Sequence, residues 1–275
     1  MRHRFRALHL RLIPVLAEAH RRLSPPLDLN SIAPILVLGN QKTGSSAIAG
    51  LLAARTGSSM ATDLSEAWTR EFEFANDRTK LVSFIDANRY YFRRTIVKEN
   101  SLTLAASTLF AVIPNACGVF VVRHPVQNIR SILDRLDWPG DPRPIESLPD
   151  VPRTWQQVIN VKPWGTEAAD HISALAHRWR LTTEAVIRNR ARGEVVRYED
   201  FNDDKLGTID HVANQLGLPN RLPVGHLLEH PFQPRGTRRG YKIDDVFSEE
   251  AVATIERICS DGMADLGYES VRIVG

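Results

Sequence analysis

Residues 35–55, ILVLGNQKTGSSAIAGLLAAR, are the stretch that decides the fold. Ile35–Leu38 is a short run of branched apolar residues, which is typical of a strand buried on both faces of a sheet. Gly39–Gly44 follows as a glycine-containing loop, and Ser45–Arg55 has the composition of a helix. The sequence therefore predicts a strand, a loop and a helix in direct succession.

Apolar runs and helical segments continue to alternate on the carboxyl-terminal side of this unit. We expect strands at Thr95–Lys98, Gly118–Val122 and Glu194–Arg197, and helices at Leu102–Val112, Val126–Leu136, about 167–190, and onward to about Gly267. The Pro-rich stretch Trp138–Pro163 is expected to be one long loop. This alternation predicts an α/β fold, a P-loop-like parallel β-sheet flanked by helices on both faces. We expect a single domain, residues 31–275, after a basic extension, residues 1–30.

Composition bounds the classes of function. A chain of 275 residues at 43% apolar can bury a large core, and a net charge of +3 is too small to favour nucleic acid as a partner. Cys117 and Cys259 have neither metal-site spacing nor the pattern of a disulfide framework. No apolar run approaches the roughly 20 residues that span a membrane. We therefore expect a cytoplasmic protein without a bound metal.

The first 23 residues carry most of the excess positive charge. They hold six Arg and a single Glu, with Leu8, Leu12, Val15 and Leu16 at helical spacing. Two interpretations of this segment remain open. The segment is a helix packed on the domain, or it is an interfacial helix that makes weak contact with an anionic membrane surface.

The loop Gly39–Gly44 predicts an anion site, because backbone N–H groups at a helix start have no partner within the helix and the helix dipole favours negative charge there. An ATP or GTP phosphate loop would have the pattern G-x-x-x-x-G-K-[ST]. Here Ser45 follows Gly44, and the lysine is inside the loop at Lys42. The strand ending at Val122 is followed by Arg123, not by the Asp that holds Mg²⁺. These two differences make a P-loop nucleotide or small-molecule kinase the less favoured interpretation, and we keep it as the alternative.

Two motifs resemble those of sulfotransferases that use 3′-phosphoadenosine 5′-phosphosulfate (PAPS). Lys42-Thr43-Gly44-Ser45-Ser46 resembles the family's 5′-phosphosulfate loop. Phe120–Pro125, with Ser131 eight residues after Arg123, resembles its 3′-phosphate motif. A dianionic phosphate suits a bidentate cation with a hydroxyl donor, so the second motif also has a direct physical reading.

Weaker similarities extend from about Pro34 to Tyr268. Val97–Asn100 and the tryptophan-bearing segment Ala176–Ala185 look like parts of the carbohydrate and tyrosyl-protein branches. Val195–Phe201 is similar to a Tyr-Glu-Asp segment whose role is more often structural than catalytic. Gly236–Lys242 looks like the loop that closes over the adenosine, and Ser248–Tyr268 resembles the closing helix.

The resemblance implies a metal-independent transfer of a sulfuryl group from PAPS to an acceptor hydroxyl or amine, with a carbohydrate as the first choice of acceptor. The residues implied in donor binding are Gln41, Lys42, Thr43, Gly44, Ser45, Ser46, Arg123, Ser131, Arg238, Arg239 and Gly240. Lys42 would stabilise charge on the leaving oxygen, and Lys98 is also implied in catalysis. A nucleotide-binding regulatory protein without catalysis is a third reading.

The general base is less clearly marked. By similarity to the tyrosyl-protein branch it lies near Asp63 or Glu66, and we rank Glu66 first, Asp63 second and Glu99 third. Glu99 ranks last because a strand would point Lys98 and Glu99 to opposite faces. Trp155 and Trp164 lie in or beside the Pro-rich stretch, where they either stack on the acceptor or anchor the loop.

Overall fold

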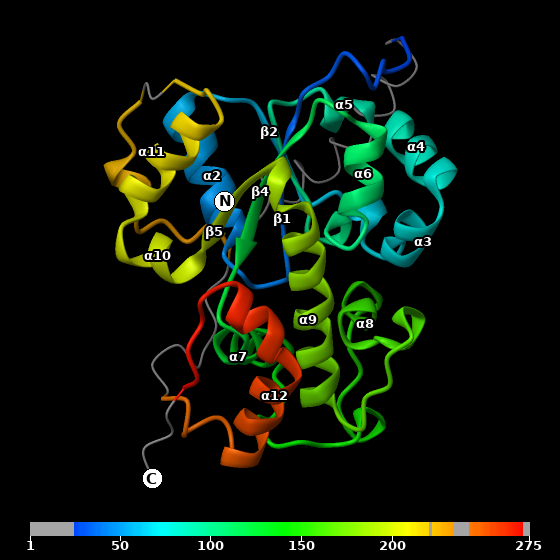
Figure 1. Ribbon diagram of the computed structural model, residues 1–275, viewed down its shortest axis with the longest axis vertical. Helices are drawn as coiled ribbons and strands as arrows, with labels where there is room; N and C mark the ends of the chain where they lie inside the picture. The colour runs from blue at the N-terminus through cyan, green and yellow to red at the C-terminus, as the bar shows by residue number, and fades with distance from the viewer. Residues whose placement is uncertain (1–24, 220–221, 234–241, 272–275) are drawn as a thin grey trace, which may run out of the picture.

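The computed structural model describes residues 25–219, 222–233 and 242–271 (Figure 1). Its centre is a five-stranded sheet in the order β2-β3-β1-β4-β5, in which every neighbouring pair is parallel. The strands are β1 (Ile35–Gly39), β2 (Met60–Thr62), β3 (Ile96–Lys98), β4 (Cys117–Val122) and β5 (Gly193–Arg197). This confirms the predicted α/β class and the parallel sheet.

Helices cover both faces of the sheet. They include α2 (Ser45–Thr56), α4 (Arg78–Ala87), α6 (Ala106–Val112), α7 (Pro125–Leu136), α9 (His171–Asn189), α11 (Lys205–Gln215) and α12 (Glu249–Asp265). Residues of β1 alternate between two apolar cores: Leu36 and Leu38 face the core that contains α6, α7, α9 and α12, and Ile35 and Val37 face α2 and α11. Figure 1 shows these two layers on either side of the sheet.

Four short helices complete the described fold. They are α3 (Glu71–Asn76), α5 (Arg89–Phe92), α8 (Arg153–Ile159) and α10 (Tyr198–Asp203). The prediction of a single long loop between Trp138 and Pro163 is wrong, because α8 lies within it. Pro152 immediately before its first residue is compatible with a helix start, where a missing N–H costs no helical hydrogen bond.

Two helix starts differ from those expected. The helix expected from about 167 starts at His171, because Asp170 caps it by accepting from Ser173 N at 2.8 Å. The helix expected from Leu102 starts at Ala106, after a separate 3-10 turn, Asn100–Leu102. The predicted helix at 1–23 and the residues Arg238, Arg239 and Gly240 lie outside the described residues. In the part of the chain that is described, no helix has both the length and the apolar character to cross a bilayer.

Candidate active site

The carboxyl ends of β1, β3 and β4 meet at one edge of the sheet, where the structure has a pocket of about 710 Å³. The β1–α2 loop forms its floor, and α7, α10 and the segment 228–233 contribute to its walls. Residues implied by the sequence that line it are Gln41, Lys42, Gly44, Ser45, Ser46, Asp63, Lys98, Arg123 and Ser131. The parallel topology thus brings into one cavity residues that are far apart in the chain.

The β1–α2 loop owes its shape to two residues with left-handed backbone conformation, Lys42 (φ 66°) and Gly44 (φ 93°). Gly44 precedes the first residue of α2, and a Cβ on it would lie 2.3 Å from a ring carbon of Tyr198. Only glycine fits both the conformation and this space. The loop therefore presents the amino end of α2 to the pocket, as an anion site requires.

Hydrogen bonds hold this loop against the neighbouring elements. Ser45 Oγ donates to Asn100 Oδ1 at 3.0 Å, and Asn100 Nδ2 donates to the carbonyl of Asn40 at 3.1 Å. Thr43 is buried and its hydroxyl donates to the same carbonyl at 2.9 Å. The Thr43 side chain is not among the residues that line the pocket, so in this structure it shapes the loop and does not face the cavity.

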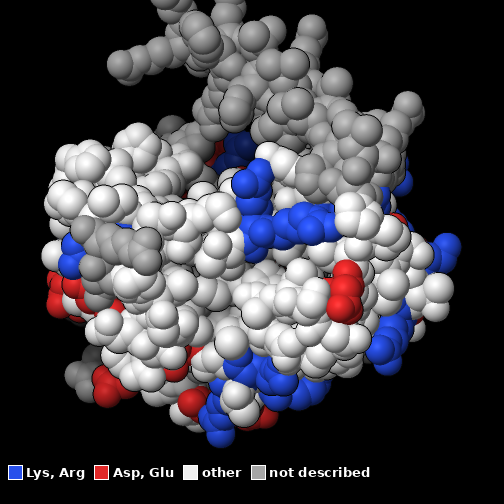
Figure 2. Space-filling model, turned by 90° about the horizontal axis from the view of Figure 1, so that it is seen from above, with Lys and Arg blue, Asp and Glu red and all other residues white. Residues whose placement is uncertain are grey.

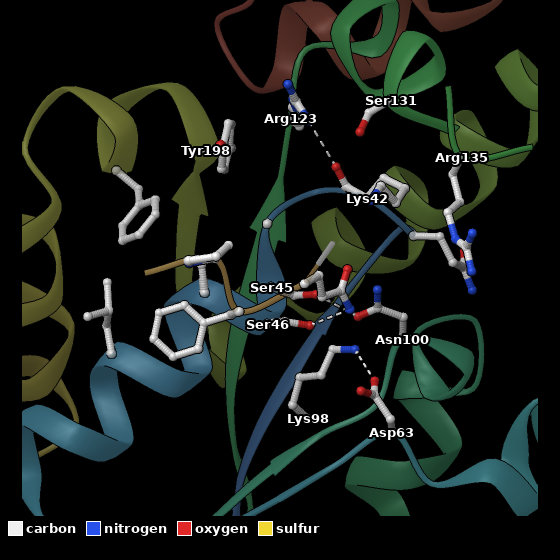
Figure 3. Close-up of a pocket in the computed structure, with 18 of the residues that line it drawn as sticks. Lys42, Ser45, Ser46, Asp63, Lys98, Asn100, Arg123, Ser131, Arg135 and Tyr198 are labelled. Carbon is white, nitrogen blue, oxygen red and sulfur yellow. Dashed lines mark hydrogen bonds and ion pairs between the residues drawn. The ribbon is translucent and has the colours of Figure 1, made fainter. Parts of the chain in front are cut away.

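Arg123 follows β4 and lies above the loop in Figure 3. Its Nη1 donates to the carbonyl of Lys42 at 3.1 Å, and its guanidinium stacks over Tyr198 at 4.5 Å from the ring centroid. Its Nε is buried and has no partner among the described residues. Burial lowers the pKa of Arg123, and an unsatisfied, desolvated cation of this kind is stabilised by an anion.

Positive charge is concentrated around Lys42. Burial lowers the pKa of Lys42, and the nearby charges of Arg135 and Arg123 lower it further, while the charge of Asp134 opposes this. Arg130, Ser131 and Arg135 of α7 line the same part of the pocket. Figure 3 shows Arg123 and Ser131 on one side of the loop and the Lys98–Asp63 pair on the other. The pocket is therefore electrostatically prepared for a ligand with more than one anionic group.

Lys98 and Asp63 form an ion pair with Nζ and Oδ1 2.7 Å apart. The Lys98 side chain is 5% exposed, whereas Asp63 is 44% exposed, so the carboxylate is accessible from the pocket. Asp63 has φ 57°, an uncommon conformation for a residue other than glycine. Strained backbone of this kind concentrates at functional sites.

The other two carboxylates ranked from the sequence are placed differently. Glu66 is exposed, accepts from Ser65 Oγ at 3.2 Å, and is not among the residues that line the pocket. Glu99 lines the pocket beside Lys98, because β3 ends at Lys98 and the strand alternation used to rank it last does not continue. The geometry therefore does not support ranking Glu66 ahead of Asp63 and Glu99 as the general base.

The oxygens of Glu99 are already engaged. They accept from the backbone N of Leu64 at 2.6 Å, from Trp68 Nε1 at 3.2 Å and from the backbone N of Ser101 at 2.9 Å. Burial raises the pKa of Glu99, although the Lys98 charge opposes this. These contacts assign Glu99 a role in holding the segment that carries Asp63.

A buried ion pair behind the loop has no clear sequence signal. Arg178 of α9 and Glu71 of α3 form two hydrogen bonds, of 2.5 and 2.6 Å, and both side chains are almost fully buried. Arg178 Nη2 also donates to Gln41 Oε1 at 3.3 Å. A single Arg in an otherwise ordinary helix gives no hint of this contact, because it depends on how α3, α9 and the loop pack.

Three aromatic residues singled out from the sequence have distinct positions. Trp155 lines the pocket, whereas Trp164 packs edge-on against Phe72 with ring centroids 5.2 Å apart and is not a lining residue. Trp179 Nε1 donates to the carbonyl of Arg123 at 2.8 Å. Trp155 is thus available to a ligand, and Trp164 and Trp179 support the structure around the pocket.

Tyr198 and Glu199 of the Tyr-Glu-Asp segment have different positions and roles. Glu199 accepts from the backbone N of His124 and from the Tyr268 hydroxyl, each at 3.0 Å, and so joins the end of β4 to α10 and the end of α12. This agrees with a structural role for that carboxylate. Tyr198 itself lines the pocket, against Gly44 and Arg123.

No cluster of three or more His, Cys, Asp or Glu side chains suited to a metal ion occurs within residues 25–219, 222–233 and 242–271. The acidic and basic groups of the pocket are instead interspersed. Lys205 and Glu229, for example, form an ion pair across the end that is lined by the segment 228–233.

Comparison with known proteins gives a structural likeness and no sequence match. No family model matches the chain, and no curated protein matches it. The structure is similar to the sulfotransferase STF9 from Mycobacterium avium, with a TM-score of 0.54 over 94% of this chain and 82% of that chain at 13% identity. Two further similarities are weaker. The sulfotransferase STF1 from Mycobacterium tuberculosis has a TM-score of 0.49 at 13% identity, covering 90% and 81%, and the sulfotransferase domain from the curacin biosynthetic pathway has 0.47 at 14%, covering 88% and 100%. The chain therefore has the fold of the sulfotransferases.

Proposed function

We propose that the chain is a sulfotransferase that transfers the sulfuryl group of PAPS to an acceptor hydroxyl or amine. One observation carries this proposal. The phosphate loop and a second, separate cationic site around Arg123 and Ser131 open into the same cavity. A nucleoside with phosphate groups at two different positions matches this arrangement, whereas the phosphates of ATP form one continuous chain.

The pocket also offers a place for a purine. Tyr198, Phe201 and Phe232 line the end beyond Gly44, and Phe232 packs against Gly50 of α2, where a Cβ would lie 2.3 Å from the ring. Aromatic faces suit a flat heterocycle. In our proposal the adenine lies at this end, the 3′-phosphate binds Arg123 and Ser131, and the 5′-phosphosulfate binds the loop.

The chemistry follows from the residues around the loop. The bond between sulfur and the bridging oxygen of the 5′-phosphate breaks, and a bond forms between sulfur and the acceptor oxygen or nitrogen. Lys42 stabilises the charge that develops on the bridging oxygen. Asp63 accepts the proton of the acceptor, since it lines the pocket and is exposed to it, and Lys98 holds its carboxylate in place.

We further propose a carbohydrate as the acceptor class. Trp68, Trp155 and Thr154 line the same pocket as Asp63. Aromatic faces combined with a carboxylate and hydroxyl donors suit a ring that carries several hydroxyl groups. A phenolic acceptor would favour a more apolar enclosure, and a peptide acceptor is an outcome that the assay below can detect.

The proposal places the enzyme in the cytoplasm, where Cys117 and Cys259 would remain reduced. Both are free cysteines in the structure, Cys117 exposed and Cys259 buried. Burial raises the pKa of the Cys259 thiol, so that thiol is unreactive.

The test is formation of adenosine 3′,5′-bisphosphate from PAPS in the presence of EDTA, with panels of oligosaccharides, phenols and peptides as acceptors. We expect turnover with the oligosaccharides and its loss in Lys42→Ala. An enzyme that leaves PAPS intact with every acceptor, but hydrolyses or transfers phosphate from ATP with Mg²⁺, would overturn the proposal in favour of a kinase. Turnover with peptides alone would replace only the acceptor class.

A further inference from the structure

The edge of the sheet opposite the pocket carries a group of arginines. They precede β3 and β5 or lie in the last turn of α9, and we call them the amino-edge arginines: Arg93, Arg94, Arg188, Arg190 and Arg192. In a parallel sheet the segments that lead into the strands all meet at this edge. Figure 2 looks onto this face, at the top of Figure 1, and shows a group of basic side chains near its centre, with acidic and basic side chains together at its margins.

Contacts of these arginines leave their charge uncompensated. Arg93 Nη2 donates to the carbonyl of Pro25 at 3.2 Å, and Arg192 Nη2 donates to the carbonyls of Pro114 and Ala116. Arg94 stacks over Tyr90 at 4.4 Å from the ring centroid. Carbonyls and rings fix the positions of guanidinium groups without neutralising them.

Carboxylates near this edge have other partners. Asp86 pairs with Arg89, and Glu194 pairs with His211 at 3.7 Å. Among the described residues, none of the amino-edge arginines forms an ion pair with a carboxylate. At this edge the five amino-edge arginines therefore outnumber the carboxylates Asp28, Asp86 and Glu194, and the excess of positive charge attracts an anionic partner.

The chain also joins the described structure at this edge. Pro25 contacts Arg93, and Asn115 Nδ2 donates to the carbonyl of Asn30 at 2.6 Å, so residues 25–30 run along the same face. The 24 residues before Pro25 add six Arg against one Glu. The segment that precedes Pro25 in the sequence thus carries charge of the same sign as the amino-edge arginines.

The sequence of that segment favours a lipid surface over nucleic acid. Leu8, Leu12, Val15 and Leu16 recur at the spacing of one helix face, among the arginines. An apolar stripe with flanking basic residues matches the boundary between headgroups and acyl chains, whereas a nucleic acid offers no matching apolar layer. Each cation near an anionic bilayer adds to the attraction.

We propose that the amino edge of the sheet docks on an anionic membrane surface, with the amino-edge arginines facing the lipid headgroups. The pocket lies at the opposite edge of the sheet and so faces the aqueous phase. If the chain acts as proposed above, its acceptor then approaches from the aqueous side while the enzyme is held at the membrane; only this consequence rests on the proposed function.

The experiment is sedimentation of the full chain with vesicles of phosphatidylcholine, with and without phosphatidylserine. We expect binding only to the phosphatidylserine vesicles, and weaker binding at higher salt. Arg188→Glu/Arg190→Glu should reduce the partition coefficient at least about tenfold, since it replaces two positive charges by negative ones. Both residues are exposed, and among the described residues neither side chain forms an ion pair, which favours normal folding; the thermal unfolding temperature checks this.

The matched control is Lys162→Glu/Arg257→Glu, which makes the same change in charge at exposed positions elsewhere on the chain. It should sediment nearly as the unaltered protein does, and both variants should keep their affinity for adenosine bisphosphate. Three results would overturn the proposal: no binding to phosphatidylserine vesicles, equal losses in both variants, or binding that survives Arg188→Glu/Arg190→Glu and disappears only when residues 1–24 are removed. Preferential binding to a single-stranded oligonucleotide, with none to vesicles, would overturn it in favour of a nucleic-acid surface.

Discussion

The burial of Lys42 beside two arginines determines how donor binding should respond to pH. These surroundings lower its pKa, so the ammonium that attracts the donor is present below that pKa and is lost as the pH rises through it. The basic limb of kcat/KM for PAPS should therefore begin at a lower pH than an ordinary lysine would give.

Lys42→Arg provides the test of this limb, because a guanidinium keeps its proton to beyond pH 12. The pH dependence of kcat/KM should lose its basic limb in this variant, while Lys42→Ala should lower turnover by about 10²–10³-fold. A basic limb of unchanged position in Lys42→Arg would assign it to another group.

A second prediction at the residue scale separates Asp63 from Glu66. Asp63→Asn should reduce kcat by about 10²–10⁴-fold, the usual contribution of a general base, and leave the affinity for adenosine bisphosphate nearly unchanged. Glu66→Gln should retain its turnover, because Glu66 lies outside the pocket lining. Loss of the acid limb of the pH–rate profile in Glu66→Gln, but not in Asp63→Asn, would reverse the assignment.

At the level of residues, the sequence predicted most of the residues of the β1–α2 loop. It did not predict the buried side chains that hold this loop in place. The pattern Lys42–Ser46 is local, so spacing alone marks it. The bonds of Arg178 to Glu71 and Gln41 join residues that are 107 and 137 positions apart, and only the folded chain brings them together. The same limit affected the general base, because counting from the loop could not tell which way Asp63 and Glu66 would point.

Helix α9 holds the β1–α2 loop in place through the contact of Arg178 with Gln41. Removing one partner of a buried ion pair leaves an uncompensated charge, which costs about 3–5 kcal/mol. Arg178→Met should therefore lower the free energy of unfolding by an amount in that range and also weaken donor binding through Gln41. Chemical denaturation with bisphosphate binding measures both effects.

The double variant Arg178→Met/Glu71→Leu shows whether the loss of stability in Arg178→Met comes from the unpaired charge of Glu71. Apolar replacement of both groups should recover much of the free energy of unfolding, because no charge is left buried. Its donor affinity should remain low, since Gln41 still lacks the Arg178 contact. If Arg178→Met alone lowers the free energy of unfolding by less than about 1 kcal/mol, the ion pair does not stabilise the fold.

Elements with a strong periodic pattern were predictable, and short ones were not. The apolar runs at β1 and β4 are long enough to identify strands, whereas β2 has only three residues, Met60–Thr62, and pairs on one side alone. The helix α8 was hidden because prolines before and after it resemble a continuous loop. Its formation depends on burying Val158 and Ile159 against the large core.

At the scale of the whole molecule, alternating strands and helices predicted the parallel sheet but not its order. The order β2-β3-β1-β4-β5 places β1 centrally, between β3 and β4, and depends on packing between distant segments. This order matters for function, because it sets Lys98 and Arg123 on opposite sides of the loop that follows β1. A nucleotide with two separate phosphate groups is the ligand that this arrangement favours.

The most direct test of that claim is calorimetric binding of adenosine 3′,5′-bisphosphate, compared with ATP plus Mg²⁺, to the unaltered chain, Arg123→Ala and the exposed control Arg257→Ala. We predict metal-independent binding of the bisphosphate that weakens about 10- to 150-fold in Arg123→Ala, the usual range for hydrogen bonds to a charged group, and stays unchanged in the control. Tighter binding of ATP with Mg²⁺, or bisphosphate binding that is insensitive to Arg123→Ala, would contradict the proposed binding of a nucleotide with two separate phosphate groups.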